Sequence, residues 1–161
     1  SERGAYSNDW FKQIHSRKSK EERKKPKLIL IAEPDSDIHV LYSLFTKQYG
    51  FSISDVKVVQ TGNKCLEIID SSRENNGNNK NNDYDIFIVD THLRDISGFE
   101  VARKIRDRLP HKRIILTTTY SLDNISSMID SIGIKSQDVL LKPFIFSELF
   151  SILKEPRMSY N

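Results

Sequence analysis

The run of residues 85–90, Asp-Ile-Phe-Ile-Val-Asp, constrains the fold of this chain more than any other feature. A strand that is apolar on both faces is typical of the centre of a parallel sheet covered by helices. In such sheets, functional side chains gather at the carboxyl ends of the strands. Asp90 stands at that end and is therefore a candidate site residue. An Asp that only caps the following loop would give the same local pattern.

The composition indicates one globular domain with tails. The chain has 161 residues, of which 37% are hydrophobic and 29% charged, which is enough to bury a core. Cys65 is the single cysteine, so an intramolecular disulfide is excluded, and we expect it to pack in the core. No apolar run is long enough for a membrane span, and we expect a cytoplasmic protein with no membrane partner.

The first residues of the chain are basic and carry one small apolar patch. Residues 12–27 contain eight Lys or Arg and two Glu. We interpret them as a solvated linker or helix face, and we expect no nucleic-acid partner. Trp10, Phe11 and Ile14 have the i, i+1, i+4 spacing of one patch on a helical turn, which could dock elsewhere.

Two compositional changes define the expected domain organisation. Pro26 ends the basic run, and residues 71–83 are rich in Asn with almost no apolar content. We interpret the Asn-rich residues as a mobile surface loop without an assigned function. The expected parts are a basic extension or linker in residues 1–26, a domain in residues 27–155 and a C-terminal tail in residues 156–161.

Apolar residues alternate between continuous runs, which predict buried strands, and helical spacing, which predicts amphipathic helices. Strands are expected at residues 27–32, 55–60, 85–90, 113–117 and 138–141. Helices follow each strand; the first has apolar positions Ile38, Leu41, Leu44 and Phe45, an N-cap at Asp35 or Ser36, and ends at Gly50. The alternation predicts an α/β fold, with a five-stranded parallel sheet doubly wound into a three-layer sandwich.

Polar groups follow four of the five expected strands. They are Glu33 and Asp35 after the first, Asp90 after the third, Thr117 to Thr119 after the fourth and Lys142 after the fifth. Three neighbouring carboxylates repel one another, so this edge calls for Mg²⁺ or a similar hard cation together with Lys142. A cation, an ammonium group and a hydroxyl around one carboxylate form a phosphoryl-transfer site with Asp90 as nucleophile.

Three motifs in residues 27–154 resemble the receiver domain of two-component response regulators, a CheY-like and flavodoxin-like (βα)5 fold. LILIAEPDSDI at 28–38 resembles the first strand and acidic turn, DIFIVDTHLRDISGFEV at 85–101 the phospho-acceptor strand and loop, and LKPF at 141–144 the Lys-Pro-Phe motif.

The resemblance also implies the roles of individual residues. Asp90 would be the phosphorylated aspartate, Lys142 the lysine paired with it, and Thr118 the switch hydroxyl, while the Lys142–Pro143 bond would be cis. The implied ligands of Mg²⁺ are Glu33, Asp35, Asp90 and the backbone carbonyl of His92.

Several positions depart from the family pattern. Pro34 stands where the family has a second metal-binding acid, so either Asp35 replaces that ligand or Glu33, Asp90 and the His92 carbonyl hold the metal. Val139 stands where the family often has a Tyr or Phe that reorients on activation.

Two further details of the expected site stay open. The choice of Thr118 within its threonine run is open by one residue. Tyr120 could lie with His92 at the mouth of the site and slow the access of water, or it could simply face solvent.

The resemblance implies a receiver that takes a phosphoryl group from a sensor histidine kinase or phosphotransfer protein. It would catalyse only its own phosphorylation and dephosphorylation and would not turn over a separate substrate. Phosphorylation would change the affinity for a downstream protein or a second copy of the chain. The responding face would be the fourth helix (122–132), the fifth strand (138–141) and the fifth helix (147–154).

The sequence leaves rival functions open. The main alternative, motivated by Pro34 and Val139, is a degenerate receiver that binds partners without phosphorylation. An aspartyl-nucleophile phosphatase ranks lower because His92 occupies the position where such enzymes place a second acid. A flavin-binding module also ranks lower, because the loop after the first strand is acidic where a phosphate-binding loop offers hydroxyls and backbone N–H groups.

Overall fold

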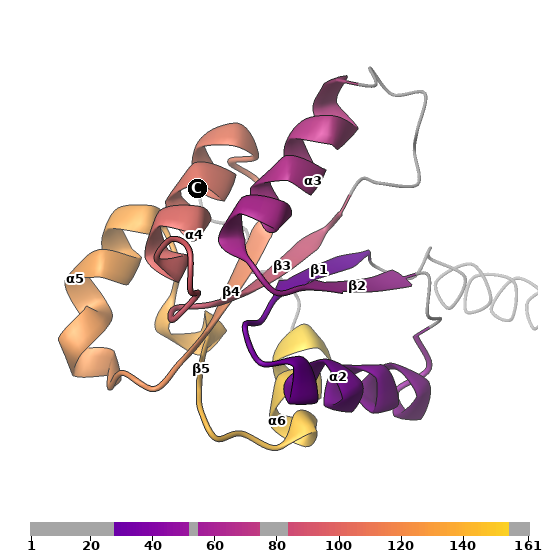
Figure 1. Cartoon of the computed structure of the whole chain (residues 1–161). Helices are drawn as coiled ribbons and strands as arrows, with labels where there is room; N and C mark the ends of the chain where they lie inside the picture. The colour runs from indigo at the N-terminus through magenta and orange to yellow at the C-terminus, as the bar shows by residue number, and fades with distance from the viewer. Residues whose placement is uncertain (1–27, 52–54, 75–83, 155–161) are drawn as a thin grey trace, which may run out of the picture.

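The computed structural model describes residues 28–51, 55–74 and 84–154, which form one sheet with helices on both of its faces (Figure 1). The strands are β1 (Ile29–Ala32), β2 (Val56–Val59), β3 (Ile86–Asp90), β4 (Arg113–Thr118) and β5 (Val139–Leu141). The helices are α2 (Ser36–Gln48), α3 (Gly62–Glu74), α4 (Gly98–Arg108), α5 (Leu122–Ile132) and α6 (Phe146–Lys154), with a 3-10 turn, η3 (Ser136–Asp138), before β5.

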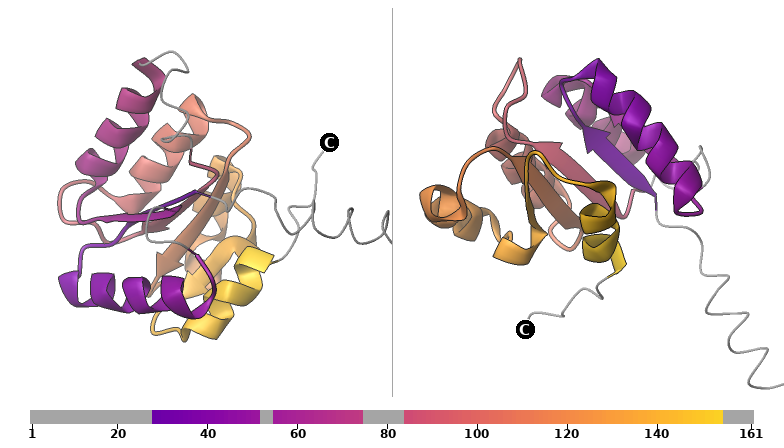
Figure 2. Two further views of the ribbon diagram at one scale, coloured as in Figure 1. Left: turned by 90° about the vertical axis from the view of Figure 1, so that its right-hand side faces the viewer. Right: turned by 90° about the horizontal axis from the view of Figure 1, so that it is seen from below.

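All strand pairs are parallel, and the strand order is β2-β1-β3-β4-β5. Helices α2 and α6 cover one face of the sheet, while α3, α4 and α5 cover the other (Figures 1 and 2). The predicted doubly wound α/β sandwich is therefore confirmed. Because parallel strands align their carboxyl ends, residues that follow β1, β3, β4 and β5 meet at one edge.

Alternation along the central strands divides the core into two layers. Leu30, Phe87 and Leu116 pack with the α3, α4 and α5 side, whereas Ile31 and Ile88 pack with the α2 and α6 side. Every residue of β1, β3 and β4 is buried. The two-sided apolar runs in the sequence therefore correspond to strands covered on both faces. Cys65 is buried in the first layer, and burial raises the pKa of its thiol to about 12.

The predicted apolar stripe of the first helix was partly wrong. Tyr42 and Phe45 are the buried aromatic residues of α2, while Leu41 and Leu44 are 43% and 57% exposed. The reason is tertiary packing, because the rings of Tyr42 and Phe45 contact Phe146 of α6 at centroid distances of 5.5 and 5.3 Å. These aromatic contacts set which side of the helix turns toward the sheet.

Other element boundaries also differ from the predictions, most of them by one or two residues. Helix α3 continues to Glu74, so residues 71–74 are helical, and residues 75–83 of the predicted loop lie outside the described residues. Asp138 belongs to η3 and not to β5. The predicted tail, 156–161, and extension, 1–26, also lie outside the described residues, so the domain boundaries stay predictions. Among the described helices, none has the length and apolar content of a membrane span.

Candidate functional site

Four side chains from the ends of different strands meet at the carboxyl edge of the sheet. They are those of Glu33, Asp90, Thr117 and Lys142. Side chains alternate between the two faces of a strand, and Ile31, Ile88 and Ile115 share the face covered by α2 and α6. Counting two residues onward from each places Glu33, Asp90 and Thr117 on that same face. The register Asp90 to Thr117 across β3 and β4 brings the carboxylate and the hydroxyl side by side.

Asp90 is the centre of this cluster. Its side chain is buried, and the residue is only 3% exposed. The backbone N–H of His92 donates to Oδ1 at 2.8 Å, and the Thr117 hydroxyl donates to Oδ2 at 3.1 Å. The Nζ atom of Lys142 lies 2.6 Å from Oδ2. One carboxylate is thus held by an amide, a hydroxyl and an ammonium group.

Lys142 joins Asp90 to the second buried acid, Glu33. Its Nζ atom lies 2.5 Å from Glu33 Oε1, and Glu33 is 1% exposed. Burial raises the pKa of Glu33, with a smaller contribution in the same direction from the charge of Asp90, and the contact with Lys142 only partly offsets them. Burial would lower the pKa of Lys142, but its hydrogen bonds to Asp90 and Glu33 outweigh this and raise it. Lys142 therefore stays an ammonium group at neutral pH.

The Lys142–Pro143 peptide bond is cis, which confirms that prediction.

The loop after β3 is fastened at its base and along its length. At the base, Gly98 N–H donates to the Thr91 carbonyl at 3.0 Å, and a Cβ on Gly98 would lie 1.9 Å from the carbonyl oxygen of Asp90. Within the loop, the Asp95 carboxylate accepts from the N–H groups of Gly62 and Asn63, at the start of α3, at 2.9 and 2.7 Å. Desolvation raises the pKa of Asp95, but backbone N–H donors, these two among them, outweigh it and lower the pKa. The loop that follows Asp90 is thus tied to the first residues of α3 and α4.

Thr118 lies on the opposite side of β4 from Thr117. Its hydroxyl contacts Thr91 Oγ1 at 2.8 Å and accepts from the N–H of Tyr120 at 3.1 Å. In this structure the hydroxyl that contacts Asp90 is that of Thr117. The sequence leaves open which threonine takes this place, because neighbouring residues of a strand point to opposite faces and only the pairing of β4 with β3 decides between them. Thr118 as the switch hydroxyl stays a prediction. Sequence reasoning missed Thr91, which directly follows Asp90 and could have been found by counting strand alternation.

The rings of His92 and Tyr120 lie together beside the Asp90 cluster. Their ring centroids are 4.6 Å apart, and His92 Nδ1 lies 3.2 Å from Thr91 Oγ1. On the other side, Phe99 at the start of α4 stacks with Tyr120 at a centroid distance of 6.3 Å. The predicted neighbourhood of His92 and Tyr120 is therefore present, although Tyr120 remains 42% exposed.

The predicted metal ligands are only partly brought together. Glu33 Oε2 is buried without a hydrogen-bond partner among the described residues. A carboxylate oxygen of this kind can ligate a hard cation. Glu33 and Asp90 offer oxygen donors of the kind that Mg²⁺ requires, so the residues fit the ion in type. Asp35 is exposed, and its Oδ1 accepts from Asp37 N–H as the N-cap of α2. Across the described residues, no three acidic, His or Cys side chains form a metal-binding group.

Two features of the expected relay and partner face can be placed. Val139, where an aromatic residue was expected from the resemblance, is buried in the core.

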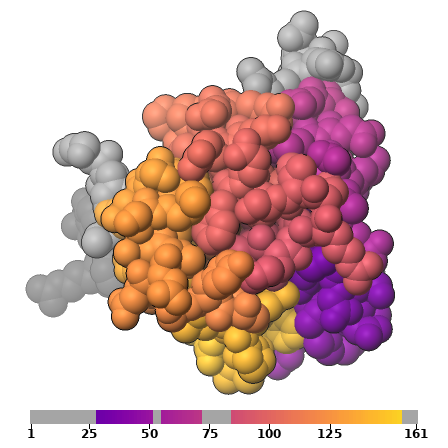
Figure 3. Space-filling view, turned by 60° about the vertical axis from the view of Figure 1, so that its left-hand side comes forward, coloured from indigo at the N-terminus to yellow at the C-terminus, as the bar shows by residue number. Residues whose placement is uncertain are grey.

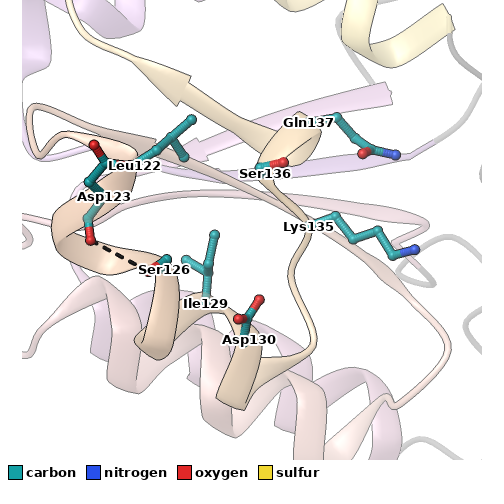
Figure 4. Close-up of a pocket in the computed structure, with 8 residues that line it drawn as sticks. All are labelled: Leu122, Asp123, Ser126, Ile129, Asp130, Lys135, Ser136 and Gln137. Carbon is teal, nitrogen blue, oxygen red and sulfur yellow. Dashed lines mark hydrogen bonds between the residues drawn. The ribbon is translucent and has the colours of Figure 1, made fainter.

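A cavity of about 540 Å³ lies between α5 and η3 (Figure 4). Asp123 and Asp130 of α5 line it together with Lys135 and Gln137 (Figure 4). Asp90 is not among its lining residues, so this cavity is separate from the cluster around Asp90.

Comparisons with known proteins agree on one family. The sequence pattern described as "Response regulator receiver domain" matches residues 29–154. The chain is 33% identical over 69 residues to the transcriptional regulatory protein CusR of Escherichia coli, covering 43% of this chain and 30% of CusR. It is 28% identical over 133 residues to the regulatory protein VanR of Enterococcus faecium, covering 83% of this chain and 51% of VanR.

The chain therefore spans about half or less of the length of these two relatives. A solved CheY-like receiver domain protein from Methanospirillum hungatei has a TM-score of 0.64 at 22% identity, covering 80% of this chain and 90% of that one. This likeness supports the fold.

Proposed function

This chain belongs to the response regulator receiver domain family, and from that membership we propose that Asp90 accepts a phosphoryl group from a sensor histidine kinase or a phosphotransfer protein. The observation that carries the proposal is the buried carboxylate of Asp90 with Lys142 Nζ 2.6 Å from its Oδ2 and the His92 N–H on its Oδ1. A carboxylate held in this way is oriented for attack and has a fixed positive charge beside it.

In the proposed step, a carboxylate oxygen of Asp90 attacks the phosphorus of a phosphohistidine in line with the leaving nitrogen. The new oxygen–phosphorus bond forms as the phosphorus–nitrogen bond breaks, and the electron pair remains on the imidazole nitrogen. Lys142 offsets the negative charge that arrives with the phosphoryl group. The His92 N–H keeps the carboxylate from rotating during the attack.

We include Mg²⁺ in the proposal as the cofactor of this site. Glu33, Asp90 and the backbone carbonyl of His92 would hold it, with Asp35 as a further ligand only if it leaves the N-cap of α2. When bound, the ion supplies neutralisation of the charge on the phosphoryl oxygens. The unsatisfied Oε2 of Glu33 supports this assignment.

Phosphorylation would act through Thr118 and the face formed by α5, β5 and α6. To bond the phosphoryl group, the Thr118 hydroxyl must exchange its contacts with Thr91 and Tyr120, which shifts an equilibrium between two arrangements. In Figure 3, the orange surface of α5 adjoins the yellow C-terminal part. Exposed Leu141 and Ile145, with the cavity beside α5, suit this face to a downstream protein or a second copy.

Receiver domains are generally not metabolic enzymes, and we propose that this one turns over no separate substrate and works in the cytoplasm. A degenerate receiver is the second candidate. It is favoured by Pro34 at the position of a metal-binding acid, by the capping role of Asp35 and by Val139 in place of an aromatic relay. The two candidates differ in whether Asp90 takes phosphate.

Intact mass measurement after incubation with acetyl phosphate and Mg²⁺ tests the proposal. Wild type should gain one phosphoryl group and Asp90→Asn should gain none. Asp85→Asn is the matched control, because Asp85 lies at the opposite end of the same strand run and accepts from Leu28 N–H at 3.1 Å. An unmodified wild type, under conditions that phosphorylate a control receiver, would overturn the proposal in favour of the degenerate receiver.

A further inference from the structure

Helix α2 has a second apolar face that points away from the core. Val40, Leu41 and Leu44 are 62%, 43% and 57% exposed. Their i, i+1, i+4 spacing places them together on one side of the helix, where Val40 and Leu44 lie farthest from the core and Leu41 borders buried Phe45. Three large apolar side chains exposed in one patch mark a surface that another group covers.

We propose that Trp10, Phe11 and Ile14 of the same chain dock on this α2 patch, defined as Val40, Leu41 and Leu44. The two sets have the same i, i+1, i+4 spacing. In the proposed docking, residues 10–14 take up a helical turn on α2, and the two apolar sets pack side chains between one another in the manner of paired helices. The proposal does not depend on phosphorylation of Asp90.

The chain that joins the two sets is long enough. Helix α2 connects the carboxyl end of β1 to the amino end of the parallel strand β2, so its C-terminal end lies at the edge where β1 begins (Figure 2). Residues 15–27 link Ile14 to this edge and can span roughly 43 Å when extended. Helix α2 has 13 residues and is therefore about 20 Å long. Every part of the α2 patch is within reach.

The small size of the α2 patch favours an attached segment over a separate partner. Stable interfaces between separate proteins bury about 1,200–2,000 Å², which is more than three side chains and their counterparts provide. A tether removes most of this requirement, because a short linker gives an effective concentration on the order of millimolar. A weak apolar contact is then sufficient to hold the segment in place.

The docked segment would cover the flank of α2 next to the acceptor edge. His39 precedes the α2 patch, and its Nε2 lies 2.7 Å from the backbone carbonyl oxygen of Glu33. A partner approaching Asp90 along α2 would first have to displace residues 10–14. The consequence is a built-in competitor for that flank of the molecule.

Trp10 is the single tryptophan and reports directly on docking in the full chain. The measurement is its emission maximum and its quenching by acrylamide at a series of protein concentrations. We expect a blue-shifted, concentration-independent emission and a quenching constant several-fold below that of a peptide of residues 1–27. Leu44→Asp and, from the other side, Ile14→Asp should each remove this protection.

Ser43→Asp is the matched control, since it adds the same charge at the neighbouring exposed position of α2, outside the α2 patch. It should leave Trp10 protected, and circular dichroism confirms that each variant is folded. Full exposure of Trp10 in wild type, or protection that survives Leu44→Asp, would overturn the proposal. Protection that weakens on dilution would overturn it as well, because it would identify a second copy as the occupant.

Discussion

Replacing Gly98 with Ala tests how closely α4 must approach the acceptor strand. A Cβ at this position would lie 1.9 Å from the Asp90 carbonyl oxygen and 2.6 Å from Thr91 Cα. Ordinary contact begins near 3.4 Å, so one backbone must move by about 1.5 Å. Flexible side chains cannot relieve this clash, since the obstructing atoms belong to the main chain.

The expected cost follows from this displacement. Overpacking costs about 1–3 kcal/mol, and we expect about 3 kcal/mol here because the main chain has to give way. For a chain of this length, that lowers the melting temperature by about 6–12 °C. A shift of about 1 Å in positioned reacting groups can cost on the order of 10²-fold in rate, so phosphorylation of Asp90 should slow by a similar factor.

Gly50→Ala provides the matched comparison. Gly50 has a φ of +82° and no atom within 4 Å of an added Cβ, so its cost is only the backbone strain of about 1–2 kcal/mol. Thermal melting and the rate of phosphate incorporation from acetyl phosphate measure both effects. If Gly98→Ala melts no lower than Gly50→Ala and takes phosphate at the wild-type rate, the close approach of α4 to Asp90 is not required.

Three further predictions concern other parts of the molecule. Burial raises the folded-state pKa of Glu33, so the stability linked to this group is present below its ordinary value of 4.5 and is lost as the pH rises through the raised pKa. The melting temperature of wild type relative to Glu33→Gln should therefore fall as the pH rises from below 4.5 through the raised pKa of Glu33, and a constant difference would contradict this. Tyr120→Ala should shorten the lifetime of the phosphorylated protein several-fold in intact mass measurements, since its ring lies against that of His92, whose N–H donates to Asp90; Tyr120→Phe should not, and equal lifetimes for the two variants would refute the shielding. Arg113→Met removes a 2.8 Å ion pair with Asp138 at the amino end of β4 and should cost about 3 kcal/mol in denaturant unfolding. Phosphorylation of this variant should be unchanged, and a loss of phosphorylation in the folded variant would show coupling across the sheet.

The fold was accessible from the sequence because its central strands are apolar on both faces. Runs such as 28–32 and 85–90 can bury both of their apolar faces only in the middle of a parallel sheet that helices cover on both sides. The acidic and basic residues that follow these runs must then meet at one edge. This is why Asp90, Glu33 and Lys142 could be grouped before the structure was known, and the contacts of Lys142 with both acids agree with that grouping.

The parts that the sequence left open depend on tertiary contacts. The spacing of α2 allows two apolar faces, and packing against Phe146 of α6 determines which one is buried. Asp35 can cap α2 or approach a metal, and in this structure its carboxylate accepts from Asp37 N–H. Thr117 and Thr118 point to opposite faces of β4, and the pairing of Asp90 with Thr117 across β3 and β4 determines which hydroxyl lies beside the carboxylate.

The most direct test of the account locates the phosphoryl group on the chain. The protein is incubated with acetyl phosphate and Mg²⁺ and then treated with borohydride, which reduces an aspartyl phosphate to homoserine. Peptide sequencing by mass spectrometry then identifies the reduced position. Homoserine is expected at position 90 alone. Homoserine at another aspartate, or none while a control receiver is labelled, would contradict it.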